Sequence, residues 1–278
     1  MTMPRPRNLI VLLLIAVPLL VGAAINLVPF LWMISTSLKT AQEVFAYPPT
    51  WIPDPITGVN YRKALDVVNS RVFLNSLIFS GSIVILQGLV TTMGGFGFAR
   101  LRFPFRDQLF VVYLGTMMIP PQVTLIPTFI IVVKLGWMNT YQGLIVPILA
   151  QGAFGTFLFR QFFLKIPEDL YDAAKLDGAS PWQLYWRLTL PLSRPVMTAY
   201  GVITFLTAWN MYLWPLVVVR SPEMKVIPMA IAELSGAMSQ DRAVTMAAVS
   251  LSVLPIVALW IVGQKWFVEG IAMSGMKG

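Results

Sequence analysis

The sequence contains no cysteine and no histidine, and only 12% of its residues are charged. The two missing residue types exclude disulfides, zinc sites built on cysteine or histidine, and histidine general bases. We therefore predict no catalytic residues and no metal site in this chain. Soluble domains usually carry ~25% charged residues, so the low share of charge favours a membrane protein.

The sequence also lacks the motifs of ATP hydrolysis, of intramembrane proteolysis and of ion-driven transport. The dipeptide Gly-Lys of the phosphate-binding loop GxxxxGK[ST] does not occur in the chain. The apolar runs contain no paired aspartates, as some intramembrane proteases need, and almost none of the ionisable groups that ion-driven transporters use. The sequence therefore predicts a membrane protein without an energy source of its own.

Apolar residues dominate what is present, because hydrophobic types make up 57% of the chain. A helix of ~20 apolar residues can cross the hydrocarbon core of a bilayer. Six stretches are long enough: Leu9–Ile34, Val72–Phe98, Leu109–Val133, Tyr141–Phe163, Val196–Val219 and Ala243–Phe267. The first exceeds the core of a signal peptide and is expected to be retained. We predict an all-α, polytopic membrane protein with six transmembrane helices, forming a single domain over residues 1–278.

Cations in short loops indicate the orientation of these helices. Arg100, Arg102 and Arg106 follow the second stretch, and Lys277 lies in the C-terminal tail. With six spans, these cations, both termini and residues 165–194 lie on one side, which we predict to be cytoplasmic. The net charge of +8 comes from cations that flank apolar runs, so we expect a bilayer and no nucleic acid as partner.

The longest polar interruption in the second half of the chain covers residues 165–194. Pro167, followed by Glu168 and Asp169, is typical of the first turn of a helix. Gly178 lies where a left-handed residue would end that helix. The pattern predicts a short first helix that ends near Gly178.

A second short helix is predicted directly after the first. Ser180, Pro181 and Gln183 fit a capping box at its start, and Pro191 is expected to end it. Residues 165–194, called the hairpin from here on, should therefore form two stiff helices joined by a sharp corner.

The hairpin resembles the cytoplasmic loop of bacterial ABC importer permeases, whose pattern is Glu-Ala-Ala, three residues, Gly, nine residues, then Ile-x-Leu-Pro. The spacing fits throughout. The matching residues are Asp172, Ala173, Ala174, Gly178, Leu188, Leu190 and Pro191. The two departures, Asp172 for Glu and Leu188 for Ile, keep the charge and the apolar character.

The resemblance covers nearly the whole chain and is closest to the carbohydrate-uptake branch, in particular to the second permease subunit of maltose and glycerol-3-phosphate importers. Similar runs occupy residues 73–77, 99–104, 118–127, 208–215 and 267–278. The resemblance implies a type I ABC importer permease fold with a coupling helix, in the inner membrane of a prokaryotic cell, with cytoplasmic N- and C-termini.

The same resemblance implies several partners. They are a homologous second permease subunit, two ATPase subunits that hold ATP and Mg²⁺, and an extracytoplasmic solute-binding protein. This chain would bind no cofactor and would form part of the pathway for a sugar or a sugar-like solute. A glycerophosphodiester or polyol importer is an alternative, and a stand-alone channel or facilitator and a structural scaffold are alternatives from other classes.

Two sets of site residues are predicted. Residues 171–178 are expected to form the docking face for the ATPase, and residues 182–190 mainly to brace it. The ATPase-coupling set is Leu170, Tyr171, Asp172, Ala173, Ala174, Leu176, Asp177, Gly178, Leu188, Leu190 and Pro191. The substrate-pathway set combines aromatic faces with an amide, which suits sugar rings and hydroxyls: Trp209, Asn210, Tyr212 and Trp214.

Two further patterns concern the spans themselves. The run 117–122 contains adjacent prolines, which remove two backbone donors and predict a break in the third span. The glycine-rich runs 94–99 and 152–156 are typical of close helix packing in membranes.

Overall fold

The computed structural model describes residues 6–236 and 241–275, and these residues form helices and connecting segments without any strand. The all-α prediction is confirmed for them. The chain divides into two compact units, Met1–Asn69 with Ile231–Val253 and Ser70–Ala230 with Leu254–Gly278. Each unit is described by itself, and the single-domain expectation stays a prediction.

The first unit begins with one long apolar helix. Its helices are α1 (Pro6–Ser37), α2 (Ala41–Val44), α3 (Val59–Val67) and the first part of α15 (Arg242–Gly275). Most described side chains of α1 are exposed and apolar, as expected for a helix in lipid or against another subunit. Asn60 of α3 holds the end of α1 through hydrogen bonds from Nδ2 to the carbonyls of Ser37 (2.8 Å) and Lys39 (2.7 Å).

The second unit holds most of the elements. They are α4 (Ser70–Arg100), α5 (Arg106–Gly115), η1 (Thr116–Met118), α6 (Pro121–Lys134), α7 (Tyr141–Leu149), α8 (Ala153–Leu164), α9 (Glu168–Leu176), α10 (Pro181–Gln183), η2 (Leu184–Thr189), α11 (Leu190–Leu192), α12 (Arg194–Trp209), α13 (Leu213–Val218) and η3 (Pro222–Met224). The helix α14 (Ile227–Leu234) and α15 each run from one unit into the other.

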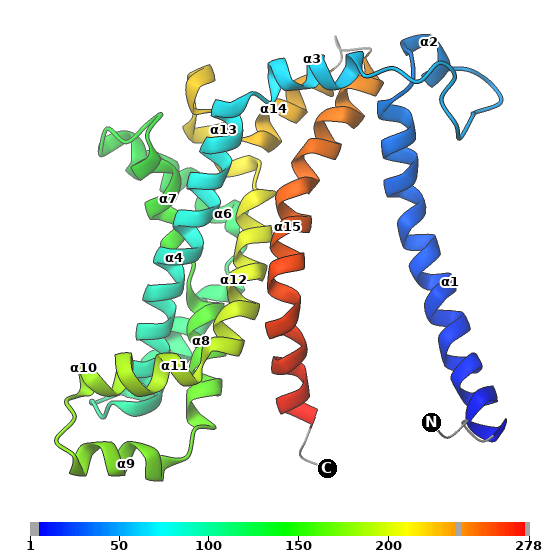
Figure 1. Ribbon diagram of the computed structural model, residues 1–278. Coiled ribbons are helices and arrows are strands. Elements are labelled where there is room, and N and C mark those ends of the chain that lie inside the picture. Colours follow the sequence, from blue (N-terminus) through cyan, green and yellow to red (C-terminus); the bar gives the residue numbers. More distant parts are fainter. Residues whose placement is uncertain (1–5, 237–240, 276–278) are drawn as a thin grey trace. The chain divides into compact units, whose positions relative to one another are not determined.

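The helix α4 is the centre of the second unit, because α7, α8 and α12 all pack against it (Figure 1). Glycines allow the closest approaches. A Cβ on Gly95 would lie 2.7 Å from Cβ of Phe159 in α8, and one on Gly155 would lie 2.6 Å from the hydroxyl of Tyr200 in α12. These contacts confirm the packing interpretation of both glycine-rich runs.

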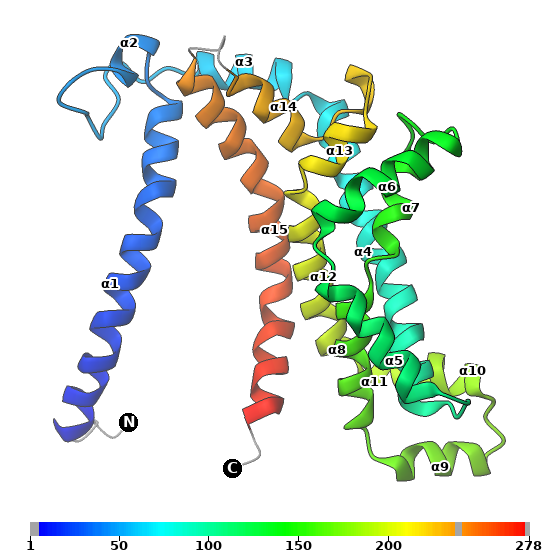
Figure 2. The ribbon, with the colours of Figure 1, turned by 180° about the vertical axis from the view of Figure 1, so that it is seen from behind.

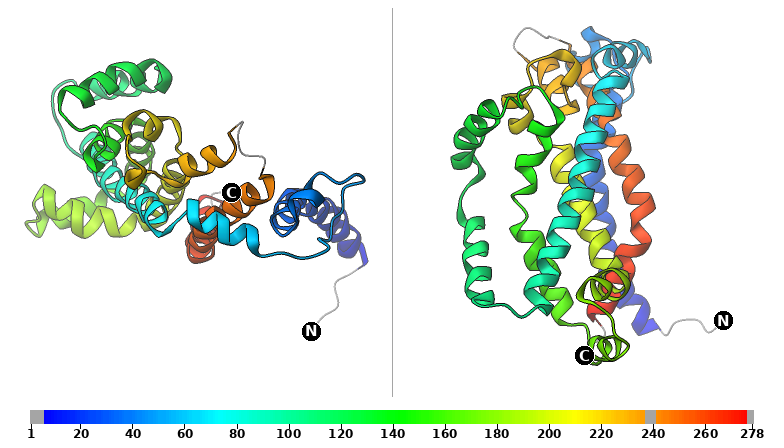
Figure 3. Two further views of the ribbon diagram at one scale, coloured as in Figure 1. Left: turned by 90° about the horizontal axis from the view of Figure 1, so that it is seen from above. Right: turned by 90° about the vertical axis from the view of Figure 1, so that its left-hand side faces the viewer.

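Two hydrophobic clusters form the core of this unit. The first contains residues of α4, α6, α7, α12 and α13, among them Phe79, Leu144 and Trp214. The second contains residues of α4, α8, α9, η2 and α12, among them Phe159 and Tyr185. In Figure 3 (right), α6 and α7 lie at one end of α4 and α5 and α8 lie toward the other end, where α9 also lies. The hairpin therefore packs on the second cluster.

Three helices of the described chain are long and apolar enough to cross a membrane: Leu14–Ser37, Ser70–Arg100 and Arg242–Ile261. Two bent pairs pass the same test, α5–η1 with α6 (97°) and α7 with α8 (48°). The break predicted in the third span is thereby confirmed. The fifth predicted span, Val196–Val219, corresponds to the shorter helices α12 and α13, and the six-span count stays a prediction. The predicted cytoplasmic cation Lys277 lies outside the described residues.

Candidate functional site: a braced hairpin and a pocket at three helix breaks

The first arm of the hairpin is α9, and its ends follow from its sequence. Pro167 is the residue before the helix, one position earlier than predicted, and Glu168 and Asp169 occupy the first turn. Gly178 has φ +81° and donates its N–H to the carbonyl of Lys175 at 2.9 Å. The predicted left-handed end of the first helix is confirmed.

The second arm starts with the predicted capping box. Gln183 N–H donates to Oγ of Ser180 at 3.3 Å, and Ser180 N–H donates to Oε1 of Gln183 at 2.8 Å. A π-helical segment, η2, follows, in which Oγ1 of Thr189 donates to the carbonyl of Leu184 at 3.0 Å. The wider turn continues directly into α11 and α12 (Figure 2).

The predicted end of the second helix at Pro191 is confirmed to within one residue. Residues 181–192 form one continuous helical run, and the run ends at Leu192, with Ser193 as its C-terminal cap. Proline breaks a helix because it lacks the N–H that the preceding turn needs, and the chain leaves the helix directly after it.

Tyr171 joins the two arms of the hairpin. It is only 2% exposed, and its hydroxyl lies 3.0 Å from Oγ1 of Thr189 in the second arm. The guanidinium carbon of Arg100 lies 4.0 Å from the centre of the Tyr171 ring, a cation–π contact. Tyr171 was predicted to dock the ATPase, but it points into the hairpin and braces it.

Arg100, the last residue of α4, holds the base of the hairpin. Its Nη2 donates to the carbonyls of Phe163 at 2.5 Å and Ile166 at 2.6 Å, at the end of α8. Charged donors of this kind form stronger bonds than neutral ones. The hairpin is therefore fixed to α4 and α8 at its first residues.

A second tie joins the other arm to α4. Tyr185 is 1% exposed, and its hydroxyl lies 2.8 Å from Oγ1 of Thr92. Burial raises the pKa of the Tyr185 phenol above its ordinary value of 10.0, and the hydrogen bond with Thr92 opposes the rise. The phenol therefore stays neutral and can serve as a permanent hydrogen-bond partner at ordinary pH.

The outer face of the hairpin carries most of the remaining predicted coupling residues. Leu176 is 90% exposed and Leu170 is 44% exposed. Asp172, Ala173, Asp177, Gly178 and Pro191 are also exposed, and Ala174, Leu188 and Leu190 are half-buried. Ala174, Asp177, Gly178 and Leu188 line a hollow of about 350 Å³ between the arms. An exposed leucine beside small residues and carboxylates is a surface suited to binding another protein.

The predicted substrate-pathway residues do not form one group. Trp209 is 2% exposed and stacks on Phe205 with ring centres 5.3 Å apart. Asn210 donates from Nδ2 to the carbonyl of Leu206 at 2.8 Å, and Tyr212 is 40% exposed. Of the four residues, only Trp214 lines one of the described pockets. Its Nε1–H donates to the backbone carbonyl of Leu144 at 3.1 Å.

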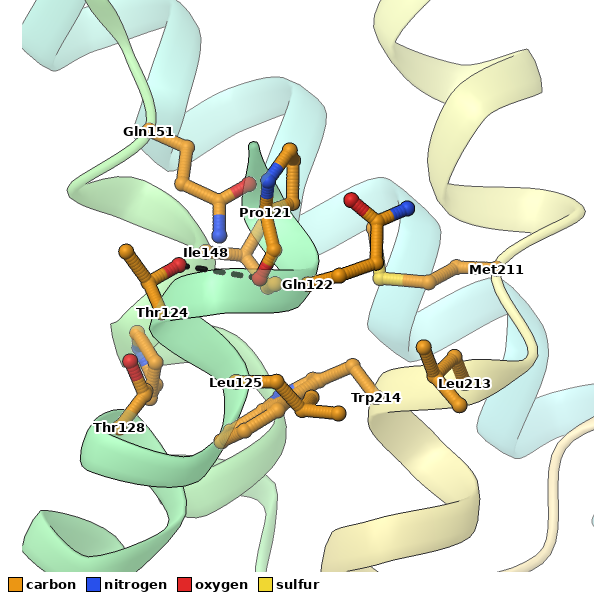
Figure 4. Close-up of a pocket in the computed structure, with 11 residues that line it drawn as sticks. Pro121, Gln122, Thr124, Leu125, Thr128, Ile148, Gln151, Met211, Leu213 and Trp214 are labelled. Atoms are coloured by element: carbon orange, nitrogen blue, oxygen red, sulfur yellow. Dashed lines mark hydrogen bonds between the residues drawn. The ribbon is translucent and has the colours of Figure 1, made fainter. Parts of the chain in front are cut away.

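That pocket, called the break pocket, encloses about 190 Å³ between α6, the α7–α8 break and the α12–α13 connection. Figure 4 shows its polar side chains, which come from α6, from Gln151 between α7 and α8, and from Trp214 of α13. The lining residues with polar side chains are Gln122, Thr124, Thr128, Gln151 and Trp214.

A second pocket of about 160 Å³ shares Ile148, Gln151 and Met211 with the break pocket. It extends along α4, α8 and α12 and adds the polar side chains Gln87, Tyr200, Thr204 and Thr207. The two pockets therefore adjoin each other within the second unit.

The substrate-pathway prediction did not include Gln122 and Gln151, which line the break pocket. Gln122 belonged to the proline-rich run predicted as a break, and Gln151 precedes a glycine that begins the α7–α8 bend. The sequence signal for the pocket was therefore a polar residue beside a helix break within an apolar run. The prediction chose Trp and Tyr instead, because these residues are large and amphipathic.

Comparison with known families places the site in context. Residues 91–272 match the model of the family described as binding-protein-dependent transport system inner membrane component. The matched region contains the hairpin and every lining residue named above except Gln87.

Two curated relatives cover nearly the whole chain. The chain is 34% identical over 269 residues to the sn-glycerol-3-phosphate transport system permease protein UgpE of Yersinia enterocolitica, covering 93% of this chain and 95% of the relative. It is 31% identical over 255 residues to the probable ABC transporter permease protein YurM of Bacillus subtilis, covering 90% and 83%.

A solved structure shares the fold. In the crystal structure of a bacterial ABC transporter involved in the import of the acidic polysaccharide alginate, one chain aligns with a TM-score of 0.76 and 23% identity. The alignment covers 96% of this chain and all of that chain. The type I ABC permease fold expected from the sequence is confirmed.

Proposed function

This chain belongs to the family of binding-protein-dependent transport system inner membrane components, and from that premise we propose that it is the permease subunit of an ATP-driven importer that couples to its ATPase through the hairpin. The chain forms the translocation pathway together with a homologous second permease. It is non-catalytic and binds no cofactor, and ATP and Mg²⁺ are held by two ATPase subunits. Its N- and C-termini face the cytoplasm.

The single observation that supports this coupling role is the combination of an exposed outer face with a fixed base. Leu176 stands free in solvent, whereas Arg100 ties the beginning of the hairpin to the ends of α4 and α8. A rigid element that projects one apolar side chain can transmit a push from a partner to the helices behind it.

Mechanistically, the hairpin is a rigid link in a two-state equilibrium. ATP binding closes the ATPase dimer, and the closed dimer binds the hairpins of the two permeases in the arrangement that opens the pathway outward. Hydrolysis removes that preference and resets the pathway. ATP acts on this chain only through its different affinities for the two arrangements of the partner.

The solute proposed is a sugar or sugar-like compound delivered by an extracytoplasmic binding protein. The solved relative of the same fold imports a polysaccharide, and the pockets of this chain offer amides and hydroxyls. A glycerophosphodiester or polyol is the second candidate, because several relatives at 34% identity are named for sn-glycerol-3-phosphate transport.

A matched pair of glycines tests the coupling role. Gly178 and Gly136 both have positive φ, +81° and +69°, and no atom lies within 4 Å of a Cβ on either. Gly178→Pro cannot adopt the left-handed conformation and is expected to remove the ATPase from the detergent-purified complex and to abolish uptake. Gly136→Pro lies outside the hairpin and should keep the ATPase bound. Retention of the ATPase and of uptake in Gly178→Pro contradicts the proposal.

A second experiment separates the importer from a stand-alone channel. Liposomes that contain this chain alone should show no solute flux, and flux should appear only with the second permease, the ATPase, the binding protein and ATP. Flux through the chain alone would favour the channel instead.

A further inference from the structure

Three interruptions of helical backbone meet at the break pocket. They are the 97° bend before α6, the 48° bend between α7 and α8, and the connection of residues 210–212 between α12 and α13. Each interruption contributes a residue to the lining of the pocket. These residues are Gln122, Gln151 and Met211. Non-helical backbone within a membrane occurs only where protein buries it or where it lines a water-filled cavity. The convergence is therefore covered by another subunit or lines a water-filled cavity, and the two amides in its lining favour the cavity.

The two exposed glutamines of this pocket, together with Thr128, differ from the other polar groups around it. Gln87 donates from Nε2 to the carbonyl of Ile148 at 3.0 Å, and Thr124 donates to the carbonyl of Pro121 at 3.0 Å. Neither Gln122 nor Gln151 has a side-chain hydrogen bond to any residue that the structure describes. Figure 4 shows both amides beside the pocket. Two amides with unused donors and acceptors are thus available to a ligand.

Charge is absent from both pockets. None of the described lining residues is Asp, Glu, Lys or Arg. An anionic solute at membrane depth would need a cation or several strong donors as partner. An amide instead offers two N–H donors and a carbonyl acceptor, which match a hydroxyl that both donates and accepts.

We propose that the two pockets are this chain's half of a solute site, which takes an uncharged, hydroxyl-rich solute such as a sugar or polyol, with Gln122 and Gln151 as its hydrogen-bonding residues. The volumes fit a half-site, since about 190 and about 160 Å³ are each below the ~300–1,000 Å³ of complete ligand pockets. The other wall comes from the second permease. The site presupposes the proposed function, because the solute reaches it only through an assembled importer.

The experiment uses the complete transporter, with its binding protein, in liposomes loaded with ATP. Uptake is measured for radiolabelled maltose, trehalose and glycerol, and for sn-glycerol-3-phosphate. Wild type is expected to import an uncharged solute. Gln122→Leu and Gln151→Leu should each lower uptake about tenfold at low solute concentration, as expected for one lost hydrogen bond to the solute, and the double variant should lower it further.

Gln142→Leu is the matched control, because Gln142 is an exposed glutamine of α7 outside both pockets. It should keep wild-type uptake. All variants should keep the ATPase bound on purification and should keep hydrolysis stimulated by the binding protein. Wild-type uptake of the neutral solute by the double variant overturns the site, and exclusive import of sn-glycerol-3-phosphate overturns the solute class.

A measurement on the wild-type chain covers the case in which a leucine variant fails to assemble. A photoreactive derivative of the imported neutral solute, activated during turnover, should label peptides that contain Gln122 or Gln151. Labelling of the second permease alone overturns the site. If the binding protein does not stimulate ATP hydrolysis by the wild-type transporter, the proposed function itself is contradicted, which is a different result from import without any contribution of the two glutamines.

Discussion

The polar side chains that brace the hairpin are buried or half-buried and bonded within the protein, whereas the two glutamines of the break pocket are exposed. In the hairpin, the hydroxyls of Tyr171 and Tyr185 and the Nη2 group of Arg100 each bond to a fixed partner within the protein. In the break pocket, the amides of Gln122 and Gln151 bond to none of the described residues. Satisfied polar groups make a structure rigid, whereas unsatisfied ones are free for a ligand. The contrast agrees with the two proposed roles, coupling for the hairpin and solute binding for the break pocket.

The largest expected effect tests whether the hairpin really depends on its fixed partners. Arg100→Met removes the donor to the carbonyls of Phe163 and Ile166 and leaves them unpaired, which should cost about 2–4 kcal/mol. We expect a lower melting temperature and loss of ATP-driven uptake, with the chain still in the membrane. Arg102→Met changes an exposed arginine and should have little effect. If Arg100→Met keeps wild-type ATP-driven uptake, the hairpin does not depend on these hydrogen bonds, and it does not differ from the break pocket in the way described.

A pair of glycines in α4 tests the packing behind the hairpin. Gly95→Ala would bring Cβ to 2.7 Å from Cβ of Phe159, whereas no atom lies within 4 Å of a Cβ on Gly97. We expect Gly95→Ala to cost about 1–3 kcal/mol by overpacking, and Gly97→Ala to be neutral or slightly stabilising because alanine favours helix. Thermal unfolding of the purified complex measures both. Equal melting temperatures for Gly95→Ala and Gly97→Ala would contradict the tight packing, because they would mean that α8 shifts away from α4 without loss of stability.

A smaller effect isolates one hydrogen bond between the arms of the hairpin. Tyr171→Phe keeps the ring contact with Arg100 but removes the hydroxyl that forms a hydrogen bond with Thr189. The loss of this bond should lower the free energy of unfolding by about 1 kcal/mol. Hydrolysis should be retained while uptake per ATP falls several-fold, because the two arms are less firmly joined. Tyr47→Phe is the control, since Tyr47 is 94% exposed. An unchanged ratio of uptake to hydrolysis would assign the bracing to the ring alone.

The smallest effect appears only at high pH. Burial raises the pKa of Tyr185 above 10.0, so the folded chain retains a proton that the unfolded chain loses. Stability from this group is complete below about pH 10 and falls as the pH rises through the higher folded pKa. The melting temperature of wild type should therefore fall more steeply above pH 10 than that of Tyr185→Phe. Parallel curves would mean that Tyr185 is not buried in solution.

The local chemistry of the hairpin was predictable because it depends on near neighbours. The capping box at Ser180 and the left-handed Gly178 follow from rules that involve four or five consecutive residues. The π-helical turn before Pro191 was not predictable, because it forms where Tyr185 and Thr189 contact Thr92 and Tyr171, which are distant in the sequence. Tyr171 was misjudged for the same reason, since its partner Arg100 lies far away in the sequence.

The break pocket shows a similar limit. The proline pair 120–121 predicted a break, but nothing in the sequence indicated that breaks in three spans meet at one place. That meeting depends on how α6, α7 and α13 pack together. Sequence reasoning therefore chose aromatic residues from one span, whereas the pocket combines polar residues from two others.

The unbroken length of α4 has a mechanical consequence. Residues of α4 and α12 belong to both hydrophobic clusters, whereas α8 and α9 contribute to one and α6, α7 and α13 to the other. Of these two shared helices, α12 ends at Trp209, beside the pocket, and α4 continues through 31 residues. When the Arg100 end of α4 tilts, its opposite end must swing with it, whereas the interrupted helices can bend at their kinks. Ile83 and Gln87 of α4 line the second pocket, so a small rotation at Arg100 is expected to change the width of that pocket.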